Sequence, residues 1–354
     1  MAPDGKNRYR KITSSVALAM SGNHTQTDAL SFLDQSNATS DGIDEKWAAS
    51  NEQWWDWYLS LATNDGRDLG PEVEVQPLPE LSQPSLEEVA AELDVAYQLT
   101  PESIEFFRRE GFIKLKQICS PASLLLLRRS LEGLFARAIG NAPAMRFPSL
   151  EMMWRIDPIA RAFVLSRRLA GIAAQLLGVD SVRLYHDNAL SKLPGCGRTP
   201  WHYDAHHYPI ASENVVTIWM PLQPTPQEMG PLAFARGMDN WRRVADLPFS
   251  KFDDSYDRGI ATALRDGGVA VEDGAFELGE VSFHHTRSIH NAGPNRTSLA
   301  RMALATTYFE TGARMVDSPT LISGDFEKFM PGVQPGEPIA SELNPVVYAQ
   351  EHAS

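Results

Sequence analysis

The spacing of apolar residues changes along the chain in a way that predicts helices first and a β-rich core after them. Capping hydroxyls before Pro101 and Pro121 each mark the start of a helix, and another helix should begin at Ser85. The helix that starts after Ser120 is strongly apolar and should run to about residue 138. The pattern therefore predicts a helical layer ahead of the sheet.

Strand signals begin inside this helical layer and dominate further along the chain. Residues 111–115 look like a short strand, and a helix expected at 167–177 should end at Gly178, which tolerates the left-handed conformation. From Val182 onward, short apolar stretches separated by Gly and Pro are typical of an all-β core. We therefore expect a mainly β fold with surrounding helices, of the α+β class.

The N-terminal region differs in composition from the rest of the chain. Residues 1–45 are crowded with small polar residues and lack a sustained apolar pattern, so they should form a tail that does not fold by itself. Residues 68–84, which hold many prolines and acidic residues, should form an extended linker. The expected units are a tail (1–45), a helical extension with its linker (46–95), a main domain (96–320) and a C-terminal extension (321–354).

Aromatic residues between this tail and the linker repeat with helical spacing. This spacing predicts a helix with an aromatic face. The helix could simply pack on the main domain, cover the active site, or join two copies of the chain in a homo-oligomer. The residues that form its apolar face are Trp47, Trp54, Trp55, Trp57, Tyr58 and Leu61.

Charge and composition narrow the classes of function. The 354 residues, 43% of them hydrophobic, can bury a sizeable core, and no stretch approaches the roughly 20 apolar residues of a membrane span. A net charge of -13 without a long basic run argues against a nucleic-acid partner. The two cysteines, Cys119 and Cys196, exclude a zinc ribbon or disulfide scaffold. We expect a cytoplasmic protein that acts on a small molecule, without a membrane partner.

The candidate chemistry begins at residues 201–204, which read Trp-His-Tyr-Asp. In an extended strand, residues i and i+2 point to the same side, so His202 and Asp204 can converge on one ion. His290 lies far enough along the chain to come from a neighbouring strand of a jelly-roll-like barrel. Two imidazoles and one carboxylate can hold Fe(II) on one face and leave positions open, and Arg301 could anchor a diacid beside the metal. This set predicts an oxidative enzyme.

Four further histidines accompany the candidate ligands. His206 would share the face of Asp204 in a straight strand, whereas His207 would point away, and both are expected at the mouth of the site or on a polar surface. His284 and His285 alternate faces of another strand, so one of them could support the site, although a structural role is the simpler interpretation for each.

Several ordered motifs resemble the phytanoyl-CoA dioxygenase family over roughly residues 100 to 312. The resemblance implies a double-stranded β-helix, a jelly-roll or cupin-like core that uses Fe(II), 2-oxoglutarate and O2. The motifs are LYHDNALSK (184–192), TPWHYD (199–204), VVTIWMPL (215–222), GPL (230–232) and HNAGPN (290–295).

The resemblance also implies roles for single residues. His202, Asp204 and His290 match the iron ligands, and Arg301 matches the basic residue that pairs with the distal carboxylate of 2-oxoglutarate. A guanidinium presents a planar fork to a carboxylate, which favours Arg301 over Arg287 and Arg296. Asn188 and Trp219 match positions that line the co-substrate site, although either could be ordinary packing residues. His206 and Tyr203 are the candidate substrate-pocket residues.

The expected reaction is oxidation of a small organic substrate, most simply hydroxylation of an unactivated C–H bond, with release of succinate and CO2. A specialised metabolite is the favoured substrate class. Residues 235–238 depart from the longer Pro-Gly-Ser-His element of many relatives, and the first 95 residues have no counterpart in the family. The alternatives are a fatty acyl-CoA hydroxylase, a cupin-like metal enzyme without 2-oxoglutarate, and a catalytically silent β-helix protein that binds a metabolite or partner.

Overall fold

Two antiparallel sheets form the centre of the molecule. The structure, a computed structural model, describes Tyr58, Ala62 and residues 69–139, 146–250, 253–319 and 326–350. The seven-stranded major sheet has the order β1-β8-β5-β10-β3-β11, and β2 pairs with β3 beside this path. Its strands are β1 (Phe112–Leu115), β2 (Ser149–Glu151), β3 (Ser181–Lys192), β5 (Val215–Pro221), β8 (Val281–His285), β10 (Arg301–Glu310) and β11 (Val346–Ala349).

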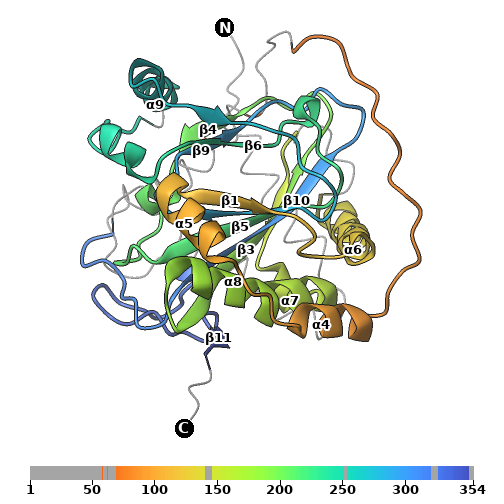
Figure 1. Ribbon diagram of the computed structural model, residues 1–354, viewed down its shortest axis with the longest axis horizontal. Helices are drawn as coiled ribbons and strands as arrows, with labels where there is room; N and C mark the ends of the chain where they lie inside the picture. Colours follow the sequence, from red (N-terminus) through yellow and green to blue (C-terminus); the bar gives the residue numbers. More distant parts are fainter. Residues whose placement is uncertain are drawn as a thin grey trace, which may run out of the picture.

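The four-stranded minor sheet, of order β4-β9-β6-β7, lies over one face of the major sheet (Figure 1). Two facing antiparallel sheets bury the residues between them, which is the arrangement of a jelly roll. The expected mainly β, double-stranded β-helix fold is therefore confirmed. The strands of the minor sheet are β4 (Thr199–His202), β6 (Leu232–Ala235), β7 (Val271–Glu272) and β9 (His290–Ala292).

Helices cover the other face of the major sheet and one end of the molecule. In Figure 1, α4, α7 and α8 lie beneath the major sheet, α6 lies at its side, and α9 lies next to β4. The helices are α4 (Leu86–Asp94), α5 (Pro101–Glu110), α6 (Pro121–Ile139), α7 (Pro158–Val164), α8 (Arg167–Leu177) and α9 (Ser255–Asp266). The 3₁₀ turns are η2 (Met153–Arg155), η3 (Asp204–His206), η4 (Gln227–Met229), η5 (Met238–Arg243) and η7 (Phe326–Lys328).

The predicted helix boundaries are confirmed where capping chemistry marks them. The Ser85 side chain accepts from the Glu88 amide while the Glu88 carboxylate accepts from the Ser85 amide, which closes a capping box at the start of α4. Thr100 caps α5 ahead of Pro101. Gly178 ends α8 in the left-handed conformation with φ 71°. These short-range signals need no tertiary contact to act, which is why they can be read from sequence.

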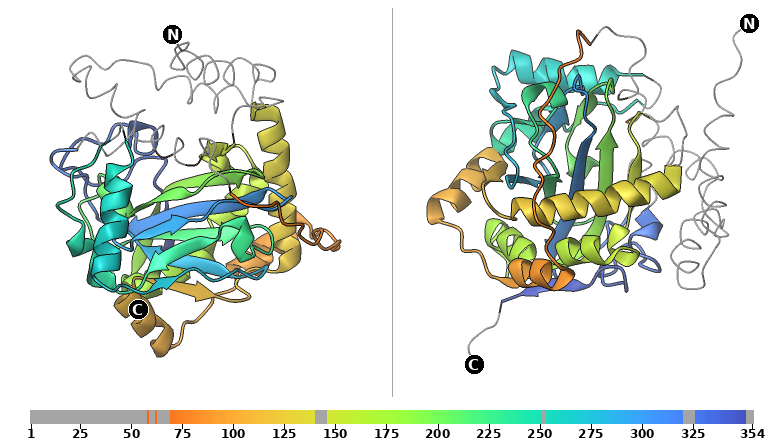
Figure 2. Two further views of the ribbon diagram at one scale, coloured as in Figure 1. Left: turned by 90° about the horizontal axis from the view of Figure 1, so that it is seen from above. Right: turned by 90° about the vertical axis from the view of Figure 1, so that its right-hand side faces the viewer.

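The predictions for the segments that flank the main domain can be compared with the structure only in part. Residues 69–84 run as an extended segment along the outside of the molecule (Figure 2), as expected of a linker, with one isolated bridge from Val73 to Thr297. Of the predicted aromatic helix, only Tyr58 and Ala62 are described, and both are helical. The expected tail at 1–45 lies outside the described residues. The assignment of these segments as separate units remains a prediction.

The largest apolar cluster fills the space between the major sheet and the helices, and a second cluster lies beside the minor sheet. In the first, Phe283 of β8 and Phe163 of α7 are completely buried, and each such side chain contributes about 2 kcal/mol to folding. The second includes Tyr58, Phe147 and Cys196. Among the described residues, no helix has the length and apolar character needed to cross a membrane.

Gly230 brings two loops of the minor sheet into unusually close contact. It ends η4 with φ 69°, and a Cβ built there would lie 2.2 Å from the backbone oxygen of Gly293. No real Cβ contact is this short, so one of the two backbones would have to move. This close approach is the physical reason for glycine at this turn.

Replacement of Gly230 by alanine should destabilise the fold by more than about 1 kcal/mol, because backbone strain adds to a backbone clash. Gly268→Ala is the matched control, since its φ is 62° and a Cβ there meets nothing within 4 Å. Urea unfolding of both variants measures the difference between them. Equal losses of unfolding free energy would mean that the Gly293 contact contributes nothing.

Candidate metal centre

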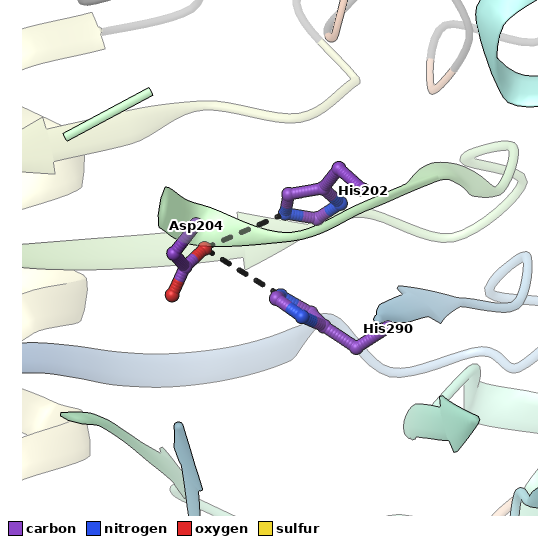
Figure 3. A group of neighbouring side chains, drawn as sticks. All are labelled: His202, Asp204 and His290. Atoms are coloured by element: carbon purple, nitrogen blue, oxygen red, sulfur yellow. Dashed lines mark ion pairs between the residues drawn. The ribbon is translucent and has the colours of Figure 1, made fainter. Parts of the chain in front are cut away.

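Three buried side chains converge where the minor sheet meets the turn after β4. The ligand atoms of His202, Asp204 and His290 all lie within 4.8 Å of one another. Asp204 Oδ1 is 3.9 Å from His202 Nε2 and 3.8 Å from His290 Nε2 (Figure 3). The structure therefore brings together the three residues that the sequence nominated as metal ligands.

Strand pairing and local backbone conformation explain this convergence. The register of β4 and β9 places His202 directly opposite His290. Strand β4 ends at His202, but Tyr203 keeps an extended backbone, with φ -137° and ψ 141°, before the chain turns at Asp204. His202 and Asp204 therefore point to the same side, as the i, i+2 spacing predicted.

Backbone carbonyls orient both imidazoles toward Asp204. His202 Nδ1 lies 2.9 Å from the oxygen of Pro200, and His290 Nδ1 lies 3.0 Å from the oxygen of Ser288. Because a carbonyl only accepts, each Nδ1 carries the proton and each Nε2 keeps a lone pair facing the centre. Burial lowers the pKa of His202 and of His290, which keeps both rings neutral and able to bind a metal.

The carboxylate of Asp204 is held from its other side by the major sheet. Thr217 Oγ1 donates to Oδ2 at 2.8 Å, and His284 Nε2 lies 3.4 Å from the same oxygen. Burial alone would raise the pKa of Asp204, but the His284 hydrogen bond and the neighbouring imidazoles outweigh burial and hold it well below the usual range. Asp204 is therefore an oriented carboxylate with Oδ1 directed at the two histidines.

The donor set fits a catalytic iron site better than a structural zinc site. Two neutral imidazoles and one carboxylate occupy one side of a metal and leave the remaining positions to ligands, which is the facial arrangement of non-haem Fe(II) oxygenases. Structural zinc takes four protein ligands, usually with cysteine. Both cysteines, Cys119 and Cys196, stand outside this cluster of ligand atoms.

Arg301 begins β10 and has a buried guanidinium with unused donor capacity. Its Nη1 donates to the oxygen of Gly230 at 2.6 Å, and the guanidinium lies 5.3 Å from the Trp219 ring. Burial lowers the pKa of Arg301 to about 10, so the group is still positively charged at neutral pH. Its Nε has no hydrogen-bond partner among the described residues.

Two more buried polar atoms in the same region lack a hydrogen-bond partner within the described chain. Asn188 of β3 and Trp219 of β5 both pair with Ala305 of β10, one from each side. The Oδ1 of Asn188 and the Nε1 of Trp219 are the unsatisfied atoms. Buried polar groups are nearly always hydrogen-bonded, so this row of unsatisfied atoms fits a site for a polar co-substrate. The co-substrate-binding roles of Arg301, Asn188 and Trp219 remain predictions.

Tyr203 and His206, which are close to the triad in sequence, contact each other and helix α9. The Tyr203 hydroxyl is 3.3 Å from His206 Nδ1, and His206 stacks with Tyr256 of α9 at 5.3 Å between ring centroids. The chain turns at η3 and does not continue as a strand, so the expected alternation of faces ends at Asp204. The ring of His207, expected to point away, lies 6.2 Å from that of His202. A substrate contact for Tyr203 or His206 remains a prediction.

Some residues near the site could not be chosen from the sequence. Thr217 lies in an apolar strand, and nothing in its neighbours indicates that it binds Asp204. His284 had one signal, its alternation with His285, and it is the member of the pair that contacts Asp204. Lys192 pairs in register with Arg301 and donates to the Gly293 oxygen at 2.7 Å. Each of these contacts depends on strand pairing over long separations.

Comparison with protein families supports the fold and site just described. The phytanoyl-CoA dioxygenase (PhyH) family model matches residues 107–303, which is more than half of the chain. The chain belongs to the phytanoyl-CoA dioxygenase family. The predicted family, whose model describes a dioxygenase, is therefore confirmed.

Individual relatives of this family member are distant. A probable alpha-ketoglutarate-dependent hypophosphite dioxygenase of Stutzerimonas stutzeri is 24% identical over 164 residues, which are 43% of this chain. These residues span 52% of that relative, so the chain matches about half of its length.

Solved structures share the fold of this family member at low sequence identity. The non-heme alpha ketoglutarate dependent carbocyclase SnoK from nogalamycin biosynthesis matches with a TM-score of 0.59 and 22% identity, over 75% of this chain and 99% of SnoK. EctD from S. alaskensis, solved with 2-oxoglutarate and 5-hydroxyectoine, matches with a TM-score of 0.53 and 17% identity, over 78% and 98% of the two chains.

If the three converging residues bind a metal, a divalent ion should stabilise the metal-free protein, and Asp204→Ala should remove that effect. A ligand at a hundred times its Kd stabilises a folded protein by about 2.7 kcal/mol. Thermal unfolding with and without Mn(II) or Zn(II) measures the effect. Asp239→Ala, at an exposed aspartate, is the control that should respond as the wild type does. A full response from Asp204→Ala would remove this residue from the metal site.

The Thr217 hydroxyl should matter for metal affinity more than for folding. Thr217→Val keeps the shape of the side chain but removes one of the two donors to Asp204 Oδ2, so metal affinity should fall about tenfold. Thr306→Val is a matched control, because Thr306 is a buried threonine on the adjacent strand β10. Calorimetric titration with Mn(II) compares them. An unchanged affinity in Thr217→Val would show that His284 alone orients the carboxylate.

Proposed function

We propose that the protein is an Fe(II)- and 2-oxoglutarate-dependent dioxygenase that hydroxylates an unactivated C–H bond of a small organic substrate, with release of succinate and CO2. The observation that carries the proposal is the combination of a facial His-Asp-His cluster with the buried, still charged Arg301. Membership of a dioxygenase family and a relative described as alpha-ketoglutarate-dependent support it.

The residues divide into a metal-binding set and a co-substrate-binding set. His202, Asp204 and His290 would hold Fe(II) on one side through two Nε2 atoms and one carboxylate oxygen. Arg301 would pair with the distal carboxylate of 2-oxoglutarate, because a guanidinium offers donors in a planar fork. When bound, iron and 2-oxoglutarate together activate O2 for insertion into a C–H bond.

Two further residues would complete the co-substrate site. The buried Nε1 of Trp219 would donate to an oxygen of 2-oxoglutarate. The buried Oδ1 of Asn188 only accepts, so Asn188 would contact this ligand through its amide nitrogen. Both residues lie in the strands next to Arg301. Polar groups already desolvated in the folded protein give up little hydration when a polar ligand arrives. This preorganisation supports a small, multiply charged co-substrate in this place.

The surroundings of Asp204 on the major sheet support an organic substrate. Thr217 and Thr307 share a hydrogen bond at 3.0 Å, and the Tyr208 hydroxyl lies 3.2 Å from Thr307 Oγ1. Beyond Tyr208, the ring of His186 stacks on Phe329 at 4.6 Å. Burial lowers the pKa of His186 to about 4, so this aromatic group is uncharged at neutral pH. An uncharged aromatic cluster on this side of Asp204 would suit a substrate with an organic skeleton, such as a specialised metabolite.

The position of the substrate in the site, more than acid–base chemistry, would decide which C–H bond reacts. The groups around Asp204 do not change their protonation state near neutral pH, because burial raises the pKa of Tyr208 and lowers that of His186. They can therefore orient a substrate but are poorly suited to shuttle its protons at neutral pH. Hydroxylation is the simplest outcome at such a site, because it needs only a correctly placed C–H bond.

An anaerobic absorption titration tests the co-substrate chemistry without knowledge of the substrate. Adding both Fe(II) and 2-oxoglutarate to the apoprotein should produce a weak metal-to-ligand charge-transfer band in the visible range, and either one alone should not. Arg301→Lys keeps a charge but loses the planar fork, so the band should require about ten times more 2-oxoglutarate.

Two controls make the titration decisive. Asp204→Ala should abolish the band, whereas Arg242→Lys, at an exposed arginine, should leave the titration unchanged. A wild-type protein that is folded and binds Fe(II) but gives no band with 2-oxoglutarate would contradict the proposal. It would favour a cupin-like metal enzyme that does not use this co-substrate.

A further inference from the structure

Tyr58, from the segment ahead of the main domain, lies against the metal site. Its ring meets the ring of His202 edge-on, with centroids 5.3 Å apart and an interplanar angle of 85°. It also stacks with Phe147 at 6.4 Å, and only 9% of the residue is exposed. The family match begins at residue 107, so Tyr58 belongs to a part of the chain that the family model does not cover.

A second described residue, Ala62, anchors the same segment. Its backbone oxygen accepts from the amide of Gly197 at 2.6 Å and from Cys196 Sγ at 3.0 Å. Ala62 is completely buried and, like Tyr58, helical. The loop that receives Ala62 leads directly into β4 and His202, which fixes Tyr58 relative to the metal ligands.

Tyr58 lies near both charged ends of the site, because its ring contacts His202 and also Phe147, whose ring is 6.0 Å from the Arg301 guanidinium. Its hydroxyl is hydrogen-bonded with the side chain of Thr199, and it interacts electrostatically with both Arg301 and Asp204. A tyrosine phenol is protonated at neutral pH, so this hydroxyl can act as a hydrogen-bond donor.

Arg301 by itself leaves a bound carboxylate incompletely satisfied. A carboxylate accepts about four hydrogen bonds. Arg301 cannot offer all its donors to a ligand, because its Nη1 already donates to the oxygen of Gly230. Among the described residues, no carboxylate forms an ion pair with Arg301. A dianionic ligand held by Arg301 would therefore need a further donor, and the Tyr58 hydroxyl, which interacts electrostatically with Arg301, can supply one.

We propose that Tyr58 is a positioning residue for the co-substrate, whose phenol hydroxyl donates to the distal carboxylate of 2-oxoglutarate that Arg301 holds. The segment ahead of the main domain thereby completes a site that the β-helix builds only in part. This inference rests on the proposed function, because it assumes that Arg301 binds that carboxylate.

Calorimetric titration of the full-length protein loaded with Zn(II) tests this role without turnover. Tyr58→Phe keeps the ring that packs on His202 and Phe147 but removes the donor. It should weaken 2-oxoglutarate binding about tenfold, as expected for the loss of one hydrogen bond to a charged group. The same variant should bind Zn(II) as tightly as the wild type does.

A second ligand separates a direct contact from a general disturbance of the site. 2-Oxobutyrate has the keto acid that chelates a metal but lacks the distal carboxylate, so Tyr58→Phe should bind it as the wild type does. Tyr348→Phe, a hydroxyl removal on β11 next to Gly171 of α8, should leave both ligands unaffected.

Each of the other outcomes overturns the proposal in a distinguishable way. Equal 2-oxoglutarate affinity of wild type and Tyr58→Phe would show that the hydroxyl makes no contact with the ligand. If Tyr58→Phe weakened the binding of 2-oxoglutarate and 2-oxobutyrate equally, Tyr58 would act through the residues that bind the metal. Tighter binding in Tyr58→Phe would mean that the phenol obstructs the site. A zinc-loaded wild type that does not bind 2-oxoglutarate would refute the proposed function and this inference with it.

Discussion

The antiparallel pairing of β4 with β9 is the constraint on which the site depends. It sets His202 opposite His290, and because side chains alternate along a strand, a shift of one residue would turn one imidazole to the other face. Asp204 joins them from the turn after β4, and Thr217 of the major sheet fixes its orientation. The minor sheet therefore supplies the imidazoles, while the major sheet orients the carboxylate.

Buried charge is separated between two ends of the site. Asp204 is the anion at the metal end, where both imidazole ligands are neutral. Arg301 is the cation at the other end, and Lys192 lies beside it in register. Burial, reinforced by the charge of Arg301, lowers the pKa of Lys192 well below its usual range, so Arg301 retains most of the positive charge. This polarity suits a ligand that chelates a metal at one end and is anionic at the other.

The sequence predicted local features well and non-local ones only where a motif marked them. Ser85, Thr100 and Gly178 end or begin helices through contacts within a few residues, so their roles could be read directly. The expected orientations of His206 and His207 differ from those in the structure, because the prediction assumed that the strand continued past Asp204. A turn that begins inside a functional motif has no strong local signal when no Gly or Pro marks it.

The sequence by itself determined the class of fold, the triad residues and the basic residue opposite them, because alternation along strands and ordered motifs are properties of the chain. Only the tertiary structure decided which histidine contacts Asp204, which threonine orients it, and that Tyr58 approaches His202. These contacts join segments far apart in sequence. Their partners are set by the register of two sheets and by the docking of Ala62, which no local pattern of residues encodes.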